Sequence, residues 1–122
     1  MLILAFGMLA LGGMISYAVQ MPKLAGYRAT AAAIAASHVE RMRANSEAFI
    51  NNDYKETLTY KQNLPTGTLC VYPACTSASI AFKDRYETQS ILRNDLRPLA
   101  GMRVRCDADN CAAGRGDIWI IW

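Results

Sequence analysis

The chain has 122 residues, of which 52% are hydrophobic, which is enough for one domain with a modest core. Its net charge of +3 arises from 13 basic and 10 acidic residues that are interleaved along the chain. This pattern lacks the dense basic face that nucleic-acid binding requires, so we expect no nucleic-acid partner. The charge is also unevenly placed, because no charged residue occurs before Lys23.

Residues Leu2–Met21 form an apolar stretch in which Ser16, Tyr17 and Gln20 are the only polar breaks. An α-helix of about 20 residues spans roughly 30 Å, the thickness of the hydrocarbon core of a bilayer. A cleaved signal peptide would need a basic start and a small-residue cleavage site, and a core helix would need a larger domain around it. We therefore predict that residues 1–22 are the transmembrane half of an N-terminal helix.

Small residues in this stretch favour contact between helices. Gly7, Gly12 and Gly13 weaken a helix in water, but they allow close helix packing in lipid. Pro22 can kink the helix without ending it. The residues that we expect to pack in an assembly are Leu2, Leu4, Phe6, Leu9, Gly12, Gly13 and Pro22.

Residues 23–52 are predicted to continue the helix, because they are rich in the good helix formers Ala, Arg, Met and Glu. This half of the helix is amphipathic. One stripe recurs at spacings of three and four, and it consists of Leu24, Tyr27, Ala31, Ile34, His38, Met42, Asn45 and Phe49. The sequence Asn51-Asn52-Asp53 favours a turn and ends the helix. The predicted helix has about 50 residues and a length of roughly 75 Å, which its own domain is too small to cover. Its N-terminal half therefore needs lipid or neighbouring copies.

Four cysteines, Cys70, Cys75, Cys106 and Cys111, form two C-x4-C pairs in the C-terminal half. An even number of cysteines in a small extracytoplasmic domain favours disulfides. The alternative is a zinc site with four thiolate ligands, whose usual spacing is shorter. We favour two disulfides over zinc and lean to the local pairs, although the sequence does not choose among the connectivities.

Residues 53–122 are predicted to form the disulfide-bearing globular part. Residues 54–76 mix β-forming residues with turn signals. Ser77–Arg97 is predicted to be a second helix with Thr76 or Ser77 as its N-cap.

The end of the chain is predicted to add strands to this part. Met102–Cys106 alternates as a half-buried strand, and Ile118–Trp122 is apolar throughout, as in a central or covered strand. Trp119 and Trp122 are then expected in the core, with an exposed contact patch as the alternative. The fold class is α+β, with a long N-terminal helix packed on a small antiparallel sheet and one additional helix.

No set of residues indicates catalysis. His38 is the only histidine and lies on the apolar stripe, where a core or interface role is expected. Asp107 and Asp109 lack the glycine and glutamate of a calcium loop, and Asp84 is expected to bond within the fold. Glu40, Arg41 and Arg43 are expected on a solvated face, with ion pairing between subunits as the alternative. We expect no enzyme activity, no cofactor, no metal and no small-molecule substrate.

The segment Ala36–Asn45 reads ASHVERMRAN and resembles the end of the long helix in type IV pilus minor pilins, in particular the PilV-type pilus modification proteins. The residues of this motif are Glu40, Arg41, Met42, Arg43 and Asn45. The apolar start, a C-T-x-A-x-I-A-x-x-D segment from Cys75 to Asp84, and the stretch from Pro98 to Cys106 are also similar to that family.

The resemblance implies a pilin-like fold and a role in assembly by helix–helix polymerisation, with effects on pilus modification, surface adhesion or motility. It implies that the protein is located in the inner membrane, with its C-terminal domain in the periplasm, and that it is part of the pilus fibre after assembly. Other pilins and the pilus assembly machinery are the implied partners. The alternatives are a type II secretion pseudopilin and a membrane-tethered periplasmic binding domain that does not polymerise.

The sequence departs from the family pattern at its start. The family has a basic leader, a Gly cleavage point and a Glu that docks on the neighbouring subunit. By alignment from Gln20 backwards, Met1 stands where that Glu is found. We expect a shortened N-terminus. The chain stops in the strand-like run Asp117–Trp122, for which we expect a missing tail, with a terminal strand as the alternative.

Overall fold

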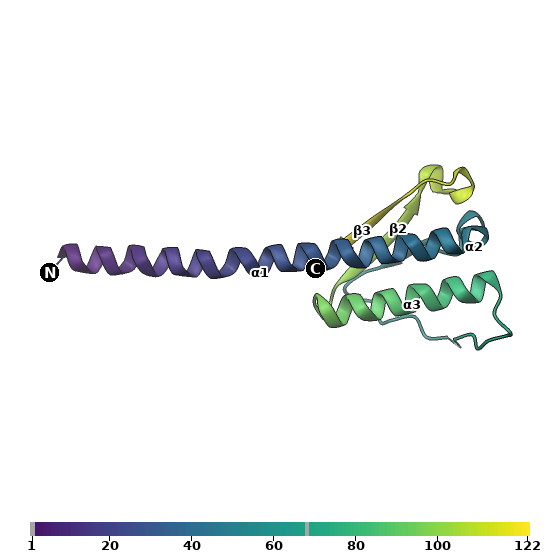
Figure 1. Ribbon diagram of the computed structural model, residues 1–122, viewed down its shortest axis with the longest axis horizontal. Helices are drawn as coiled ribbons and strands as arrows, with labels where there is room; N and C mark the ends of the chain where they lie inside the picture. The colour runs from purple at the N-terminus through teal and green to yellow at the C-terminus, as the bar shows by residue number, and fades with distance from the viewer. Residues whose placement is uncertain (1, 68) are drawn as a thin grey trace. The chain divides into compact units, whose positions relative to one another are not determined.

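The computed structural model describes residues 2–67 and 69–122, with side chains from residue 6 onward. The fold is α+β, as predicted, and its elements are α1 (Leu2–Ala44), α2 (Ser46–Ile50), β1 (Glu56–Leu58), α3 (Ser77–Asp95), β2 (Gly101–Cys106) and β3 (Gly116–Ile121). The chain divides into two compact units, Met1–Thr30 and Ala31–Trp122. Within the second unit, α3 runs alongside the C-terminal part of α1 (Figure 1).

Helix α1 continues through Pro22, as the sequence predicted, but it ends earlier than expected. Asn45 interrupts it with φ −121° and ψ 58°, and α2 then adds one more helical turn. The helical region finally ends where the Asn-rich turn was predicted, since Asn52 takes the left-handed φ of 69° that asparagine tolerates. Its side-chain Oδ1 accepts a hydrogen bond of 3.0 Å from the backbone N–H of Cys111.

The predicted second helix is α3, and its predicted N-cap is confirmed. The hydroxyl of Thr76 accepts from the N–H of Ser79, and the Ser79 hydroxyl accepts from the N–H of Thr76, which forms a capping box. The helix ends at Asp95 rather than at the predicted Arg97, because Pro98 disfavours helical geometry in the residue before it.

The sheet has the order β1-β2-β3, and both strand pairs are antiparallel. Strand β2 is central, and its Met102 and Val104 are each only 2% exposed, as the predicted alternation requires. The prediction of a central or covered strand at residues 118–122 is wrong, because within the described residues β3 pairs on one side only. Trp119 is 62% exposed and Trp122 is 38% exposed, so neither belongs to the core.

The core lies in the second unit, between the C-terminal part of α1, the helix α3 and one face of the sheet. Burial on α1 follows the helical spacing of three and four, and on β2 it follows the strand spacing of two. The buried residues of these elements include Ala31, Ile34, His38, Met42, Leu58, Ala81, Thr88, Gln89, Leu92, Met102 and Val104.

The cysteines form the two local disulfides, Cys70–Cys75 and Cys106–Cys111, with Cα–Cα distances of 5.2 Å and 4.9 Å. No free cysteine occurs in the described part of the chain. Each bridge closes a loop of the same length, but their surroundings differ. Cys106 and Cys111 are 2% and 0% exposed, whereas Cys70 and Cys75 are only half-buried.

This difference predicts unequal contributions to stability. Closing a loop this short is worth about 2 kcal/mol for either disulfide in the chain-entropy model. Replacing Cys106 and Cys111 together by alanine should lower the free energy of unfolding by about 1 kcal/mol more than the same double replacement at Cys70 and Cys75, because it also removes packed core atoms. Urea unfolding of both variants in detergent micelles, followed by circular dichroism, measures the difference, and equal losses would contradict the assignment of Cys106–Cys111 to the core.

Candidate functional site

Two features concern function: a polar junction between α1 and α3 in the second unit, and an exposed apolar surface on the first unit. The side chains of the junction are three or four residues apart in sequence, so they lie on the same side of the helical region. His38 and Arg41 share one face of α1, and Asn45 follows directly after the helix. The residues that these three bind run in the opposite order along α3. The contacts therefore join residue 38 to 88, residue 41 to 84 and residue 45 to 77.

Arg41 binds two carboxylates of α3 at once. Its Nη1 lies 3.0 Å from Asp84 Oδ1 and 2.7 Å from Glu87 Oε2. The hydroxyl of Tyr54 donates to the other oxygen of Asp84 over 2.6 Å. The hydrogen bond to Glu87 and the neighbouring carboxylates raise the pKa of Arg41, and burial with the hydrogen bond to Asp84 raises the pKa of Tyr54. Arg41 is one-third exposed and held within the subunit, so the simple solvated face expected there is wrong for this residue.

Asp84 therefore bonds within the fold, as predicted. Its side chain is 14% exposed and accepts from two different elements, the Arg41 guanidinium of α1 and the Tyr54 hydroxyl of the segment before β1. Glu40 and Arg43, by contrast, form an intrahelical pair of 2.7 Å with side chains that are 69% and 72% exposed. These two residues of the Ala36–Asn45 segment lie on a solvated face, as predicted.

His38 is completely buried, as predicted for the apolar stripe. Thr88 donates its hydroxyl proton to the backbone oxygen of Asp84 over 2.8 Å, so its oxygen is left to accept from His38 Nδ1 over 2.9 Å. The neutral ring with the proton on Nδ1 satisfies both contacts. Burial lowers the pKa of His38 to about 4, and the nearby Asp84 opposes this shift only in part.

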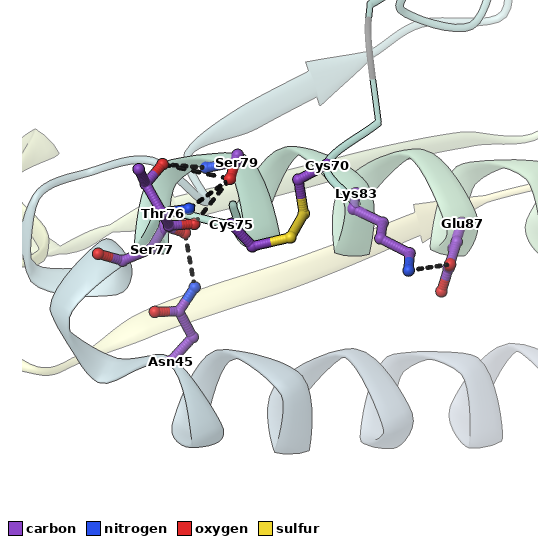
Figure 2. The surroundings of a disulfide bond; sticks show 8 residues. All are labelled: Asn45, Cys70, Cys75, Thr76, Ser77, Ser79, Lys83 and Glu87. Carbon is purple, nitrogen blue, oxygen red and sulfur yellow. Dashed lines mark hydrogen bonds and ion pairs between the residues drawn. A yellow bond between two sulfur atoms is a disulfide. The ribbon is translucent and has the colours of Figure 1, made fainter. Parts of the chain in front are cut away.

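Asn45 joins the end of α1 to the start of α3. Its side-chain Nδ2 donates to the backbone oxygen of Ser77 over 2.8 Å. Figure 2 shows this contact close to the Cys70–Cys75 disulfide and the capping residues Thr76 and Ser79. Met42 is 9% exposed and packs in the core. Arg41, Met42 and Asn45 thus hold the second unit together.

The apolar side chains of the first unit are exposed. The large ones at residues 6–24 have exposed fractions from 43% to 74%, and they are Phe6, Met8, Leu9, Leu11, Met14, Ile15, Tyr17, Val19, Met21 and Leu24. At Gly7, Gly12 and Gly13, an added Cβ would meet nothing within 4 Å. Pro22 is exposed as well. The side chains of Leu2 and Leu4, which were predicted to pack in an assembly, lie outside the described residues.

The predicted membrane span at residues 1–22 also includes positions whose side chains are not described. Among the residues that the structure does describe, no helix is both long enough and apolar enough to cross a membrane. The span therefore stays a prediction.

Comparison of the chain with family models, with characterised proteins and with solved structures finds no match.

Sequence reasoning missed three partners in the junction, which are Tyr54, Glu87 and Thr88. Tyr54 was placed only in a segment of mixed β and turn signals, and Thr88 only in a helix. Nothing in the local sequence around either residue indicates burial beside His38 or Asp84. Thr88 donates to the backbone oxygen of Asp84, a contact that a threonine can make with any residue four positions earlier in a helix.

The junction predicts unequal effects for two arginines of the motif. Arg41→Met should lower the free energy of unfolding by about 2 kcal/mol, because it leaves the mostly buried Asp84 without its cation. The matched change Arg43→Met removes an exposed pair and should cost less than about 0.5 kcal/mol. Urea unfolding of the full chain in micelles checks both values. Equal losses would show that Arg41 does not hold α1 to α3.

His38 predicts a dependence of stability on pH. Its pKa is about 4 in the folded protein and about 6.5 in an unfolded chain, so the unfolded state takes up the proton first as the pH falls. The contribution to stability is fully present above pH 6.5 and is lost as the pH falls towards 4. Because the chain has a single histidine, one ring resonance in an NMR titration reports this group. A ring that titrates near 6.5 would contradict the buried geometry, and His38→Leu should flatten the stability profile between pH 6.5 and 4.

Proposed function

We propose that this protein is a subunit of a type IV pilus or related fibre, of the minor-pilin kind, and that it acts by helix–helix assembly. The exposed apolar surface of α1 carries this proposal. Large apolar side chains cover the described part of its first unit from residue 6 to residue 24, and residues 6–15 include no polar side chain. Exposing a contiguous surface of this kind to water is unfavourable by roughly 25 cal/mol per Å², so it needs lipid or other helices around it.

Three further observations support the proposal. The glycines at residues 7, 12 and 13 leave open space where another helix can approach closely. Two disulfides in the second unit are typical of a domain that folds in an oxidising, extracytoplasmic compartment. The segment Ala36–Asn45 resembles the minor-pilin motif, and three of its residues hold α1 to α3 and the core.

The proposed mechanism assigns a separate task to each unit. Residues 1–22 stay in the inner membrane until assembly and then pack against the helices of neighbouring subunits. The second unit remains in the periplasm and afterwards on the fibre, where its surface modifies the assembly or its contacts. In this mechanism the polar junction keeps α3 attached to the part of α1 that belongs to the second unit, because Arg41 and Asn45 bind residues of α3.

Cysteine cross-linking tests helix–helix assembly. Since the native cysteines are paired in disulfides, Leu9→Cys introduces a thiol on α1 that can be oxidised in membranes of the native cells. We expect adducts with copies of the chain or with other helical subunits. Adding Gly12→Leu should reduce these adducts several-fold, although leucine strengthens a helix relative to glycine, because the larger side chain blocks close approach.

Ala18→Leu is the matched control, because Ala18 lies about 240° around the helix from Gly12. It should leave the adducts of Leu9→Cys unchanged. A chain that stays monomeric in this experiment is a tethered binding domain and not an assembling subunit. Where adducts form, deleting the gene distinguishes the two kinds of fibre, because loss of piliation indicates a pilus and loss of protein secretion indicates a pseudopilus.

A further inference from the structure

The outer face of the sheet has an aromatic ring next to charged side chains. Side chains alternate between the two faces of a strand, and the more buried set of β2 and β3 faces the helices. The other set includes Arg103, Arg105, Asp117 and Trp119, which are all exposed. The register places Arg103 opposite Trp119 and Arg105 opposite Asp117. Because opposite residues have Cβ atoms about 5 Å apart, these four side chains form one compact group.

A pocket lies at this group of side chains. It has a volume of about 460 Å³, and pockets for small ligands typically have roughly 300–1,000 Å³. The four side chains line it together with residues 106–108, which belong to the turn after β2. The Cys106–Cys111 disulfide holds this turn, and so does a hydrogen bond of 3.0 Å from the N–H of Asn110 to the backbone oxygen of Asp107. A ligand would therefore find this side of the pocket already formed.

The charges that line the pocket cancel. The lining has two positive and two negative side chains, which are Arg103, Arg105, Asp107 and Asp117. Arg105 pairs with Asp109 at 3.7 Å, and Asp107 pairs with Arg115 at 3.5 Å. Asp109 also binds Lys55 at 3.5 Å, outside the lining. A ligand with a strong charge of either sign would meet as much repulsion as attraction from the lining, so the pocket suits a neutral ligand.

Two of the charged groups and the indole ring are available to a ligand. Within residues 2–67 and 69–122, neither Arg103 nor Asp117 forms an ion pair. The cations that lie over aromatic rings in this part of the chain are over Tyr60 and Phe82, and not over Trp119. Arg103 can donate hydrogen bonds, Asp117 can accept them, and the 62% exposed indole offers a flat apolar surface. The fitting ligand therefore has one apolar side and groups that both donate and accept.

A neutral sugar has this combination of properties. The C–H groups on one side of a pyranose ring form an apolar face that stacks on an aromatic ring, and the hydroxyls both donate and accept hydrogen bonds. A neutral peptide is the main alternative, and peptides that bind to sheets do so chiefly through backbone hydrogen bonds. The backbone groups of a sheet point towards neighbouring strands and not out of its face. The face of the sheet therefore offers side chains to a ligand, which favours the sugar.

We infer that the pocket on the outer face of the sheet binds a neutral sugar, such as the end of a glycan chain. One sugar ring stacks on Trp119, and its hydroxyls accept a hydrogen bond from Arg103 and donate one to Asp117. The inference is independent of the proposed function, because every residue of the pocket belongs to the second unit. In the proposed fibre, the pocket would give the subunit a contact with glycan-bearing surfaces.

NMR of the tryptophan indole N–H groups tests the inference, because the chain has two tryptophans and only Trp119 lines the pocket. The full chain is studied in phosphocholine micelles, which contain no sugar, and the probes are lactose, cellobiose, mannobiose and chitobiose. At least one of these should shift the Trp119 signal saturably, with a dissociation constant on the order of 1 mM, and shift that of Trp122 much less. Counterparts of the bound sugar that have a carboxylate or an ammonium group should bind several-fold more weakly.

Three variants locate the binding, which is then followed on the sugar resonances by saturation transfer. Asp117→Ala should weaken binding about tenfold because it removes a charged acceptor, and Trp119→Ala should weaken it about tenfold because it removes the stacking surface. Ile121→Ala is the matched control, since Ile121 is 73% exposed on the same face but does not line the pocket. It should leave the affinity unchanged. All three side chains are exposed, so each variant should keep the circular dichroism of the parent chain.

Several outcomes would overturn the inference. These are the absence of a saturable shift with all four sugars up to about 20 mM, an unchanged affinity in Trp119→Ala, and tighter binding of an acidic sugar. A saturable Trp119 shift with an acetylated peptide of alternating glycine and serine, but with none of the sugars, would assign the pocket to a peptide and would also overturn it. Adducts from Leu9→Cys should be unaffected by Asp117→Ala, so failure here is distinguishable from failure of helix–helix assembly.

Discussion

The arrangement of the second unit depends on the ion pair between Arg41 and Asp84. This pair fixes the rotation of α1 about its own axis, because Arg41 can reach Asp84 only when the face that contains His38 and Met42 is turned towards the core. Tyr54 binds the same carboxylate and so ties the segment before β1 to both helices. One partly buried acid thus joins α1 both to α3 and to the segment before β1.

The two parts of α1 differ in what surrounds them. Residues 31–44 have a buried face that is matched to α3 and the sheet, whereas the large apolar residues at positions 6–24 are exposed. A helix with one half committed to its own domain leaves the other half available for lipid or for other helices. The polar junction and the apolar surface are therefore complementary parts of one proposed assembly function.

The sequence predicted those features of the fold that depend on interactions between residues close together in the chain. The cap at Thr76, the alternation around Val104 and the local cysteine pairs each depend on residues close in sequence, and each was predicted. The position of β3 could not be predicted in this way, because its apolar composition suits a covered strand as well as an edge. The partners of Arg41 and His38 lie more than forty positions away along the chain, so only the tertiary fold could reveal them.

The two disulfides have a consequence for how the protein bears mechanical load. Each bridge joins cysteines five positions apart, so each one closes a local loop and neither links a helix to a distant strand. A pulling force along α1 would therefore reach α3 through non-covalent contacts such as those of Arg41 and Asn45, and reach the sheet through the chain that follows α2. In a fibre under tension, the junction would yield before either covalent bridge carried any of the load.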